Sequence, residues 1–263
     1  DQARDVTATF TLKTYTLTLN KTGAGVGTVT SDVAGINCGT ACPTQNATYN
    51  HGQTVVLSHV AGADSQFVAW GGACTGASCS VSMVSDRTVS ANFKRTDKIL
   101  TVTVAGNGSG TVTSNPAGID APTDGTETYA HDTMVTLTAN PDTVTSNFAG
   151  WSGGGCTGTM LTCSVTMDQA RSVTATFTLK TYSLTLNKTG AGVGTVTSNP
   201  AGINCGTACA TQNATYNHGQ SVVLSQLAGA DSEFVAWGGT CGGAMCTVAM
   251  TQDRTVTANF KRT

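Results

Sequence analysis

The chain repeats itself, and this repetition limits its fold to an array of small domains. The segment TYTLTLNKTGAGVGTVTS begins at Thr14 and returns as TYSLTLNKTGAGVGTVTS at Thr181, an offset of 167 residues. Between these two copies lies a more divergent one, which keeps Trp151 and Phe177 at the matching places. The repeating unit is therefore about 83 residues long, in the order A, B, A, and a unit of that size can form a domain of its own.

We assign residues 13–95 to the first A repeat (A1), residues 96–178 to the B repeat and residues 179–263 to the second A repeat (A2). The joints between these repeats are only a few residues long, which leaves little freedom for one domain to swing against the next. The sequence therefore predicts tandem small domains in a stiff rod.

Residues 1–12 form an additional strand pattern. The motif Arg-x-Val-x-Ala-x-Phe occurs four times, whereas every other element occurs three times. In residues 1–12 the side chains of one face are Val6, Ala8, Phe10 and Leu12, an alternation typical of a strand that pairs within a sheet. Two interpretations remain open: the strand is donated between neighbouring chains, or the boundary of the chain falls inside a repeat.

The composition favours an all-β fold. The chain has 31 glycines among 263 residues and many Thr-Val-Thr runs, and no segment has the 3.6-residue periodicity of an amphipathic helix. In A1 the alternation predicts five strands, which are 15–20, 28–31, 54–60, 67–70 and 88–93.

The ten cysteines predict local disulfides in an oxidising compartment. Each A repeat has two closely spaced pairs, whereas the B repeat lacks the first pair and keeps the second. If bridges joined the two loops, the cysteines that remain in B would have lost their partners. The expected pairs are Cys38 with Cys42, Cys74 with Cys79, Cys156 with Cys163, Cys205 with Cys209, and Cys241 with Cys246.

Several classes of function lack support in the sequence. Charged residues are 11% of the chain and the net charge is −2, too little positive charge for a nucleic-acid-binding face. No apolar run approaches the length of a membrane span, so we expect no membrane insertion in this segment. The cysteine spacing does not fit a metal site, and we expect neither a metal nor a cofactor.

No motif predicts catalysis. The glycines at 23, 25 and 27 lie between two strand patterns with no helix after them, so they are typical of a hairpin turn and not of a dinucleotide-binding loop. His51, His131 and His218 recur in a turn before a strand and are interpreted as turn residues. No pair of carboxylates recurs at a spacing suited to glycoside hydrolysis. The expected catalytic residues are none.

The most specific side-chain feature is a tryptophan that follows a phenylalanine by three positions in each repeat. The odd spacing predicts that the two side chains lie on opposite faces of an extended strand. The tryptophan is then either a core residue or an exposed platform on which a sugar ring stacks. The candidate platform residues are Trp70, Trp151 and Trp237.

Together these patterns resemble the divergent internalin B-repeat family of bacterial surface and secreted proteins. The shared elements are T-L-T-L, then G-x-G-T-V-T-S, a Tyr-x-x-Gly turn before T-V-V-L, F-V-A-W-G-G or F-A-G-W-S-G, and a closing T-V-T-A-N-F. The resemblance covers essentially the whole chain three times. It implies a small β-rich, β-grasp-like domain used in tandem as a stalk or adhesive segment, with no catalytic motif. The added cysteine pairs are a departure from the family.

The sequence therefore predicts a non-enzymatic, extracellular or cell-surface repeat protein that forms a stalk, an adhesin shaft or a fibre. Strand exchange through residues 1–12 would let it assemble with itself. The expected partners are other copies of the chain or components of the cell surface and extracellular matrix. The alternative is a module that binds carbohydrate or another surface through the repeated tryptophan.

Overall fold

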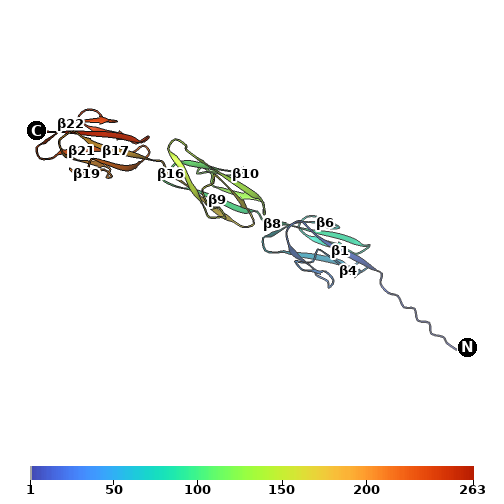
Figure 1. Cartoon of the computed structure of the whole chain (residues 1–263). Coiled ribbons are helices and arrows are strands. Elements are labelled where there is room, and N and C mark those ends of the chain that lie inside the picture. The colour runs from blue at the N-terminus through green and yellow to red at the C-terminus, as the bar shows by residue number, and fades with distance from the viewer. Residues whose placement is uncertain (1) are drawn as a thin grey trace. The chain divides into compact units, whose positions relative to one another are not determined.

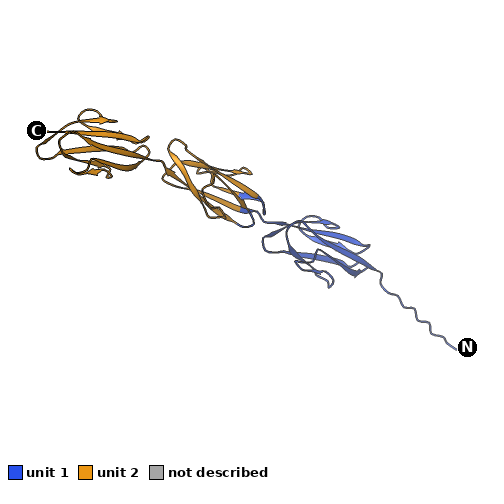
Figure 2. Ribbon diagram, in the orientation of Figure 1, with its two compact units in different colours: residues 1–98, 128–133, 167–169 blue, residues 99–127, 134–166, 170–263 orange. Residues whose placement is uncertain are grey.

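The computed structural model describes residues 2–263, and Asp1 lies outside the described residues. Contacts within the chain divide it into two compact units, shown in Figure 2. The first unit contains the chain through Lys98 together with Thr128–Thr133 and Met167–Gln169. The second contains the rest of repeat B and the whole of A2. Residues 2–263 contain no helix that is long and apolar enough to cross a membrane.

Repeat A1 folds into eight strands in two four-stranded sheets (Figure 1). One sheet has the order β4-β1-β8-β6 and the other the order β3-β2-β5-β7. The strands are β1 (Thr14–Thr22), β2 (Gly27–Ser31), β3 (Asn37–Cys38), β4 (Thr44–Asn50), β5 (Thr54–Ala61), β6 (Ser65–Gly72), β7 (Cys79–Ser82) and β8 (Arg87–Arg95).

Repeat B has the same strand orders, β12-β9-β16-β14 in one sheet and β11-β10-β13-β15 in the other. Its main difference lies in β12, which has four residues where β4 of A1 has seven. The strands are β9 (Lys98–Gly106), β10 (Gly110–Asn115), β11 (Asp120–Ala121), β12 (Thr126–Tyr129), β13 (Met134–Pro141), β14 (Ser146–Ser152), β15 (Thr162–Thr166) and β16 (Arg171–Leu179).

Repeat A2 reproduces A1 strand by strand, with sheets β20-β17-β24-β22 and β19-β18-β21-β23. The strands are β17 (Thr181–Thr189), β18 (Gly194–Asn199), β19 (Asn204–Cys205), β20 (Thr211–Asn217), β21 (Ser221–Ala228), β22 (Ser232–Gly239), β23 (Cys246–Ala249) and β24 (Arg254–Arg262).

The two sheets of a repeat share one apolar core. In A1, Leu17 and Phe93 from one sheet and Val29 and Val55 from the other are fully buried in the same cluster. The turn between the first two strands packs against this core. A Cβ atom on Gly27 would lie 2.2 Å from the Phe93 ring, so only glycine fits there. The glycine run is a turn, but the expected hairpin is wrong, because β1 and β2 belong to different sheets and the turn carries the chain from one sheet to the other.

The first and last strands of each repeat are adjacent and parallel. In A1, Leu17–Thr22 of β1 pair with Arg87–Asn92 of β8, and in repeat B residues 100–106 of β9 pair with Arg171–Phe177 of β16. Parallel neighbours run in the same direction, so the chain enters a repeat at one end and leaves it at the other.

The all-β class, the repeated small units and the local disulfides are confirmed, but besides the turn between β1 and β2 two further details differ from the sequence-based expectations. Each repeat has eight strands where five were expected, and β4 was missed because TQNATYN has no apolar alternation and buries only Tyr49. The resemblance implied a β-grasp-like unit, whereas each repeat consists of two four-stranded sheets.

Candidate functional site

One residue before the first strand of a repeat, or between the last strand of one repeat and the first strand of the next, makes backbone hydrogen bonds to the neighbouring turns. We call these residues, Lys13, Thr96 and Lys180, the joint residues. Lys180 is the joint residue between B and A2. Its N–H donates to the carbonyl of Thr145 at 2.9 Å, and its own carbonyl accepts the N–H of His218 at 2.7 Å. Because backbone groups make both bonds, this connection does not depend on the identity of the side chain.

One bond of this pair is found at each of the other equivalent positions. Thr96 donates its N–H to the carbonyl of Asp64 at 3.0 Å, and Thr263, which follows β24 as Thr96 follows β8, donates its N–H to the carbonyl of Asp231 at 3.1 Å. Both aspartates have a positive φ of 53°, an uncommon conformation outside glycine. The carbonyl of the joint residue Lys13 accepts the N–H of His51 at 2.7 Å. Backbone hydrogen bonds thus hold the main chain where one repeat ends and the next begins.

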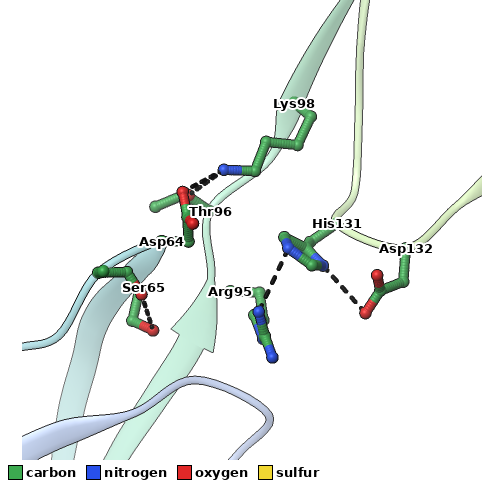
Figure 3. A network of polar contacts seen from close by, with 8 residues as sticks. Asp64, Ser65, Arg95, Thr96, Lys98, His131 and Asp132 are labelled. Carbon is green, nitrogen blue, oxygen red and sulfur yellow. Dashed lines mark hydrogen bonds and ion pairs between the residues drawn. The ribbon is translucent and has the colours of Figure 1, made fainter. Parts of the chain in front are cut away.

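Side chains add to the joint between A1 and B (Figure 3). The Lys98 ammonium donates to the carboxylate of Asp64, and this hydrogen bond, together with the positive charge, holds the pKa of Asp64 below its usual range. Arg95 Nη1 lies 3.3 Å from His131 Nε2, and His131 Nδ1 lies 3.0 Å from a carboxylate oxygen of Asp132. The turn histidine at 131 thus belongs to a polar network at the joint, a role that its place in a turn does not reveal.

The joint between B and A2 uses different side chains for the same purpose. The Lys180 ammonium donates to the carbonyl of Thr143. Asp142 lies at the start of the same turn, where the Thr145 hydroxyl donates to its carboxylate at 2.9 Å. That hydrogen bond and those from backbone N–H groups hold the pKa of Asp142 below its usual range.

All ten cysteines form disulfides, and every bridge closes a short loop. The separations along the chain are four residues in the first loop of each A repeat, five in the second, and seven in the single bridge of B. The bridges are Cys38–Cys42, Cys74–Cys79, Cys156–Cys163, Cys205–Cys209 and Cys241–Cys246.

The three tryptophans are core residues. Trp70, Trp151 and Trp237 are only 3%, 5% and 5% exposed, so their rings present no open face for stacking on a sugar. This burial corrects the hypothesis of an exposed platform. The prediction that the phenylalanine and tryptophan side chains lie on opposite faces of the strand is also wrong, because the pairing of β6 with β8 shifts register between Phe67 and Ala69. The shift turns both aromatic side chains inward, with the rings of Phe67 and Trp70 only 5.2 Å apart.

A lysine that sequence reasoning missed closes one end of each A repeat. The Lys21 ammonium donates to the carbonyls of Gly27 at 2.8 Å, of Thr40 at 3.1 Å and of Gly39. Lys188 makes the equivalent three bonds in A2. Burial lowers the pKa of both lysines. The ammonium thereby fastens the loop closed by the Cys38–Cys42 bridge onto the end of the two sheets.

Residues 2–12 have no strand partner and are exposed. Val6 and Phe10 are each 92% exposed and Leu12 is 70% exposed, and Ala8 is exposed between them. In contrast, Phe177, the equivalent of Phe10 in repeat B, is fully buried in β16. The sequence resembles β16 so closely that only Asp5, opposite Ser172, differs between residues 1–13 and 168–180.

The described residues contain no group of three or more His, Cys, Asp or Glu side chains that could hold a metal ion. The partly buried His59 stacks on Phe67 with the ring centroids 3.6 Å apart, and burial lowers its pKa. A2 has Gln226 at this position. The feature is therefore particular to A1.

Comparison with known protein families identifies three consecutive copies of one domain. The model of the divergent InlB B-repeat domain matches residues 15–97, 100–181 and 182–263. The chain belongs to this family. These matches confirm the resemblance that the sequence motifs indicate, and they cover nearly all of the residues from β1 to β24.

Solved structures share the all-β architecture. The Bacillus anthracis TIE protein matches 94% of this B-repeat chain with a TM-score of 0.52 at 6% identity, and the match covers 51% of that protein, so the chain spans about half its length. At this identity the likeness concerns the fold.

Two pilus proteins give weaker matches. The pilus adhesin SpaC of Lactobacillus rhamnosus GG has a TM-score of 0.33 at 10% identity, covering 95% of this chain and 43% of SpaC. The major pilin subunit BcpA of Bacillus cereus has a TM-score of 0.30 at 8% identity, covering 95% of this chain and 100% of BcpA. No curated protein matches the sequence significantly.

Proposed function

We propose that this chain of three tandem repeats is a non-enzymatic, extracellular or cell-surface structural segment. It acts as a stalk, an adhesin shaft or part of a surface fibre. Membership of a tandem-repeat family, disulfides in every repeat and backbone-bonded joints support this role. Five disulfides in a chain of this size are typical of an oxidising environment outside the cytosol.

The observation that carries the proposal is the parallel pairing of the first and last strands of each repeat. In A2, Leu184–Thr189 of β17 pair with Arg254–Asn259 of β24. Tension applied through the two ends of a repeat pulls these two strands past each other along their length. All of the hydrogen bonds between them then bear the load together, because they lie across the direction of pull. A repeat built in this way resists tension.

Single-molecule force spectroscopy with two pairs of attachment points tests this role. In the first geometry the chain is pulled through its two ends, and in the second it is pulled through attachment points at positions 65 and 95, which pair across β6 and β8. The second geometry opens hydrogen bonds one at a time. We expect a several-fold higher unfolding force in the first geometry, and equal forces in the two would contradict a load-bearing role.

Self-assembly through residues 2–12 is the finer part of the proposal. An extended segment with Val6 and Phe10 each 92% exposed leaves apolar surface that a partner strand would cover. The partners in this proposal are other copies of the chain, attached to components of the cell surface. Electron microscopy of the full chain beside a variant that lacks residues 1–12 is the test. Assemblies of equal length in both samples would contradict a role for the segment.

A further inference from the structure

Repeat B has an opening at one end of its two sheets that the A repeats close. We call it the B groove, and its volume is about 680 Å³. The openings in A1 and A2 that the lysine, the glycine-rich turn and the disulfide loop line are about 210 and 170 Å³. Both apolar and polar residues line the B groove; the residues that matter here are Val104, Ser109, Thr111, Pro122, Pro141 and Asp142.

The B groove exists because the chain from Ala121 to Tyr129 is three residues shorter than the matching chain from Cys38 to Tyr49 in A1. The shorter segment turns back at once, with backbone hydrogen bonds in both directions between Asp120 and Asp124 at 2.8 Å. It also lacks the disulfide found in each A repeat. Val104 takes the place of the A1 lysine, and it has no ammonium group to hold a loop across the opening.

The same shortening leaves a backbone edge open on β9. Val102 donates its N–H to the carbonyl of Gly125 at 2.7 Å, but β12 begins at Thr126 and extends no farther along β9. Two residues on, Val104 has no backbone partner on this side within the described part of the chain. In A1 the equivalent N–H of Lys21 donates to the carbonyl of Pro43 at 2.8 Å. The A repeats thus show what this edge accepts, which is an extended segment running antiparallel to the first strand.

We propose that the B groove is a docking site for an extended strand, and that its occupant is the residue 2–12 segment of a second copy of the chain. This inference rests on the proposed self-assembly and names its acceptor. The segment pairs with the open edge of β9 at Val104, and the Phe10 side chain enters the groove between the sheets. Addition of a strand to an exposed sheet edge, with a side chain anchored in a pocket, is a common mode of peptide recognition.

The segment and the B groove both present apolar groups. Val6, Ala8 and Phe10 lie on one face of an extended chain, and both large side chains are 92% exposed. Asp120, Asp124 and Asp142 lie in or beside the groove, with the Lys180 ammonium on the neighbouring Thr143 carbonyl, and residues 2–12 carry one cation, Arg4, and one anion, Asp5. The match between the segment and the groove is therefore apolar, with Phe10 as the anchor.

The alternative acceptor, a repeat that lacks its last strand, does not occur among the described residues. A1, B and A2 each contain their own copy, which are β8, β16 and β24. Insertion of residues 2–12 at the position of β16 would have to displace a strand whose Val173, Ala175 and Phe177 are essentially fully buried. Docking in the B groove displaces nothing.

Sedimentation velocity of the full chain over a wide concentration range tests the proposal. We expect concentration-dependent assembly that two single variants abolish. Val104→Lys places the lysine of the A repeats in the groove, and Phe10→Asp removes the anchor. Each should raise the apparent dissociation constant at least tenfold. Val60→Lys is the matched control, because Val60 is 68% exposed in A1, away from the groove, and its substitution should change nothing.

Hydrogen exchange on the assembled chain distinguishes the outcomes. Docking in the groove slows exchange at the Val104 amide and leaves the β16 amides protected. If Val104→Lys assembles like the wild type, or if the β16 amides lose protection on assembly, self-assembly stands but the groove is not the acceptor. If the full chain stays monomeric at every concentration, both the groove inference and the proposed self-assembly fail, whereas the load-bearing role is tested separately by force.

Discussion

Repeats A and B have the same core and differ at one end of the sheets. Phe93, Phe177 and Phe260 occupy equivalent, essentially fully buried positions in A1, B and A2. At the end near the turn between the first two strands, the A repeats have a disulfide loop fastened by a partly buried lysine ammonium, whereas B has a shorter loop, a valine and an open groove. The family fold thus tolerates a change from a closed end to an open one without altering its strand order.

The difference shows that a surface loop, and not the core, distinguishes the two kinds of repeat. Repeat B is three residues shorter between Ala121 and Tyr129. It therefore lacks the segment that covers the groove in A, the disulfide in that segment and the carbonyl groups that accept hydrogen bonds from the lysine. Core changes would lower the stability of the domain, whereas a loop at the surface changes with little effect on the packing beneath it. Substitutions that give one repeat a feature of the other can therefore test whether this loop accounts for the difference between A and B.

The largest effect is expected in the shared core. Phe177→Ala in B and Phe93→Ala in A1 each leave a cavity where a ring is fully buried, and each should lower the free energy of unfolding of its own repeat by about 3–5 kcal/mol. Hydrogen exchange in β16 and β8 measures the two repeats separately. Losses that differ by more than about 2 kcal/mol would show that the two cores are not equivalent.

Removal of the first disulfide should make A1 resemble B. Cys38→Ser with Cys42→Ser opens a loop of five residues and should lower the free energy of unfolding of A1 by about 2 kcal/mol. Hydrogen exchange in β1 and β2 reports the loss, and repeat B in the same molecule is the internal control. Unchanged protection in A1 would show that the lysine alone holds the loop.

A smaller effect is expected from Lys21→Val, which gives A1 the residue that B has at this position. The ammonium is only partly buried, so the loss of its three bonds to carbonyls should cost about 1 kcal/mol. Hydrogen exchange at the amides of β3 and β4, measured as a function of temperature or urea concentration, reports this loss of stability. Lys94→Val removes an exposed lysine of β8 and is the control. If both substitutions cost the same, Lys21 has no special role in closing the end.

The smallest effect is expected at the joint between A1 and B, and it depends on pH. The pKa of Asp64 is depressed by Lys98, so its contribution is present above the pKa of the unfolded chain and is lost as the pH falls through the depressed value. Lys98→Gln should raise the titration midpoint of the Asp64 carboxyl group in an NMR titration. Asp231, the equivalent residue of A2, is the reference. An unchanged midpoint would mean that the contact does not form in solution.

Sequence reasoning predicted the features that repetition makes visible. Three copies of one pattern revealed the domain order, and the absence of one cysteine pair in B identified the local pairing in A. The all-β class followed from alternation and glycine-rich turns.

Features that depend on contacts between distant segments were not predicted from the sequence. Alternation along β1 and β8 shows that each strand has a buried face, but not that the two strands lie side by side and parallel. The register shift before Trp70 places this side chain on the face that simple alternation assigns to the other side. Lys21 has the sequence context of an ordinary surface lysine, and only the folded loop brings three carbonyls to it.

The short span of the disulfides determines how far a repeat lengthens once its strands separate. The two bridges of an A repeat enclose only short loops of four- and five-residue separation, in the connections from β3 to β4 and from β6 to β7. Of the roughly 83 residues in a repeat, about 70 therefore remain free to extend, which corresponds to roughly 230–250 Å of extended chain at about 3.3–3.6 Å per residue. Each domain thus holds a reserve of length that the bridges do not restrict, and a sudden pull would be absorbed by the extension of one domain while its neighbours stay folded.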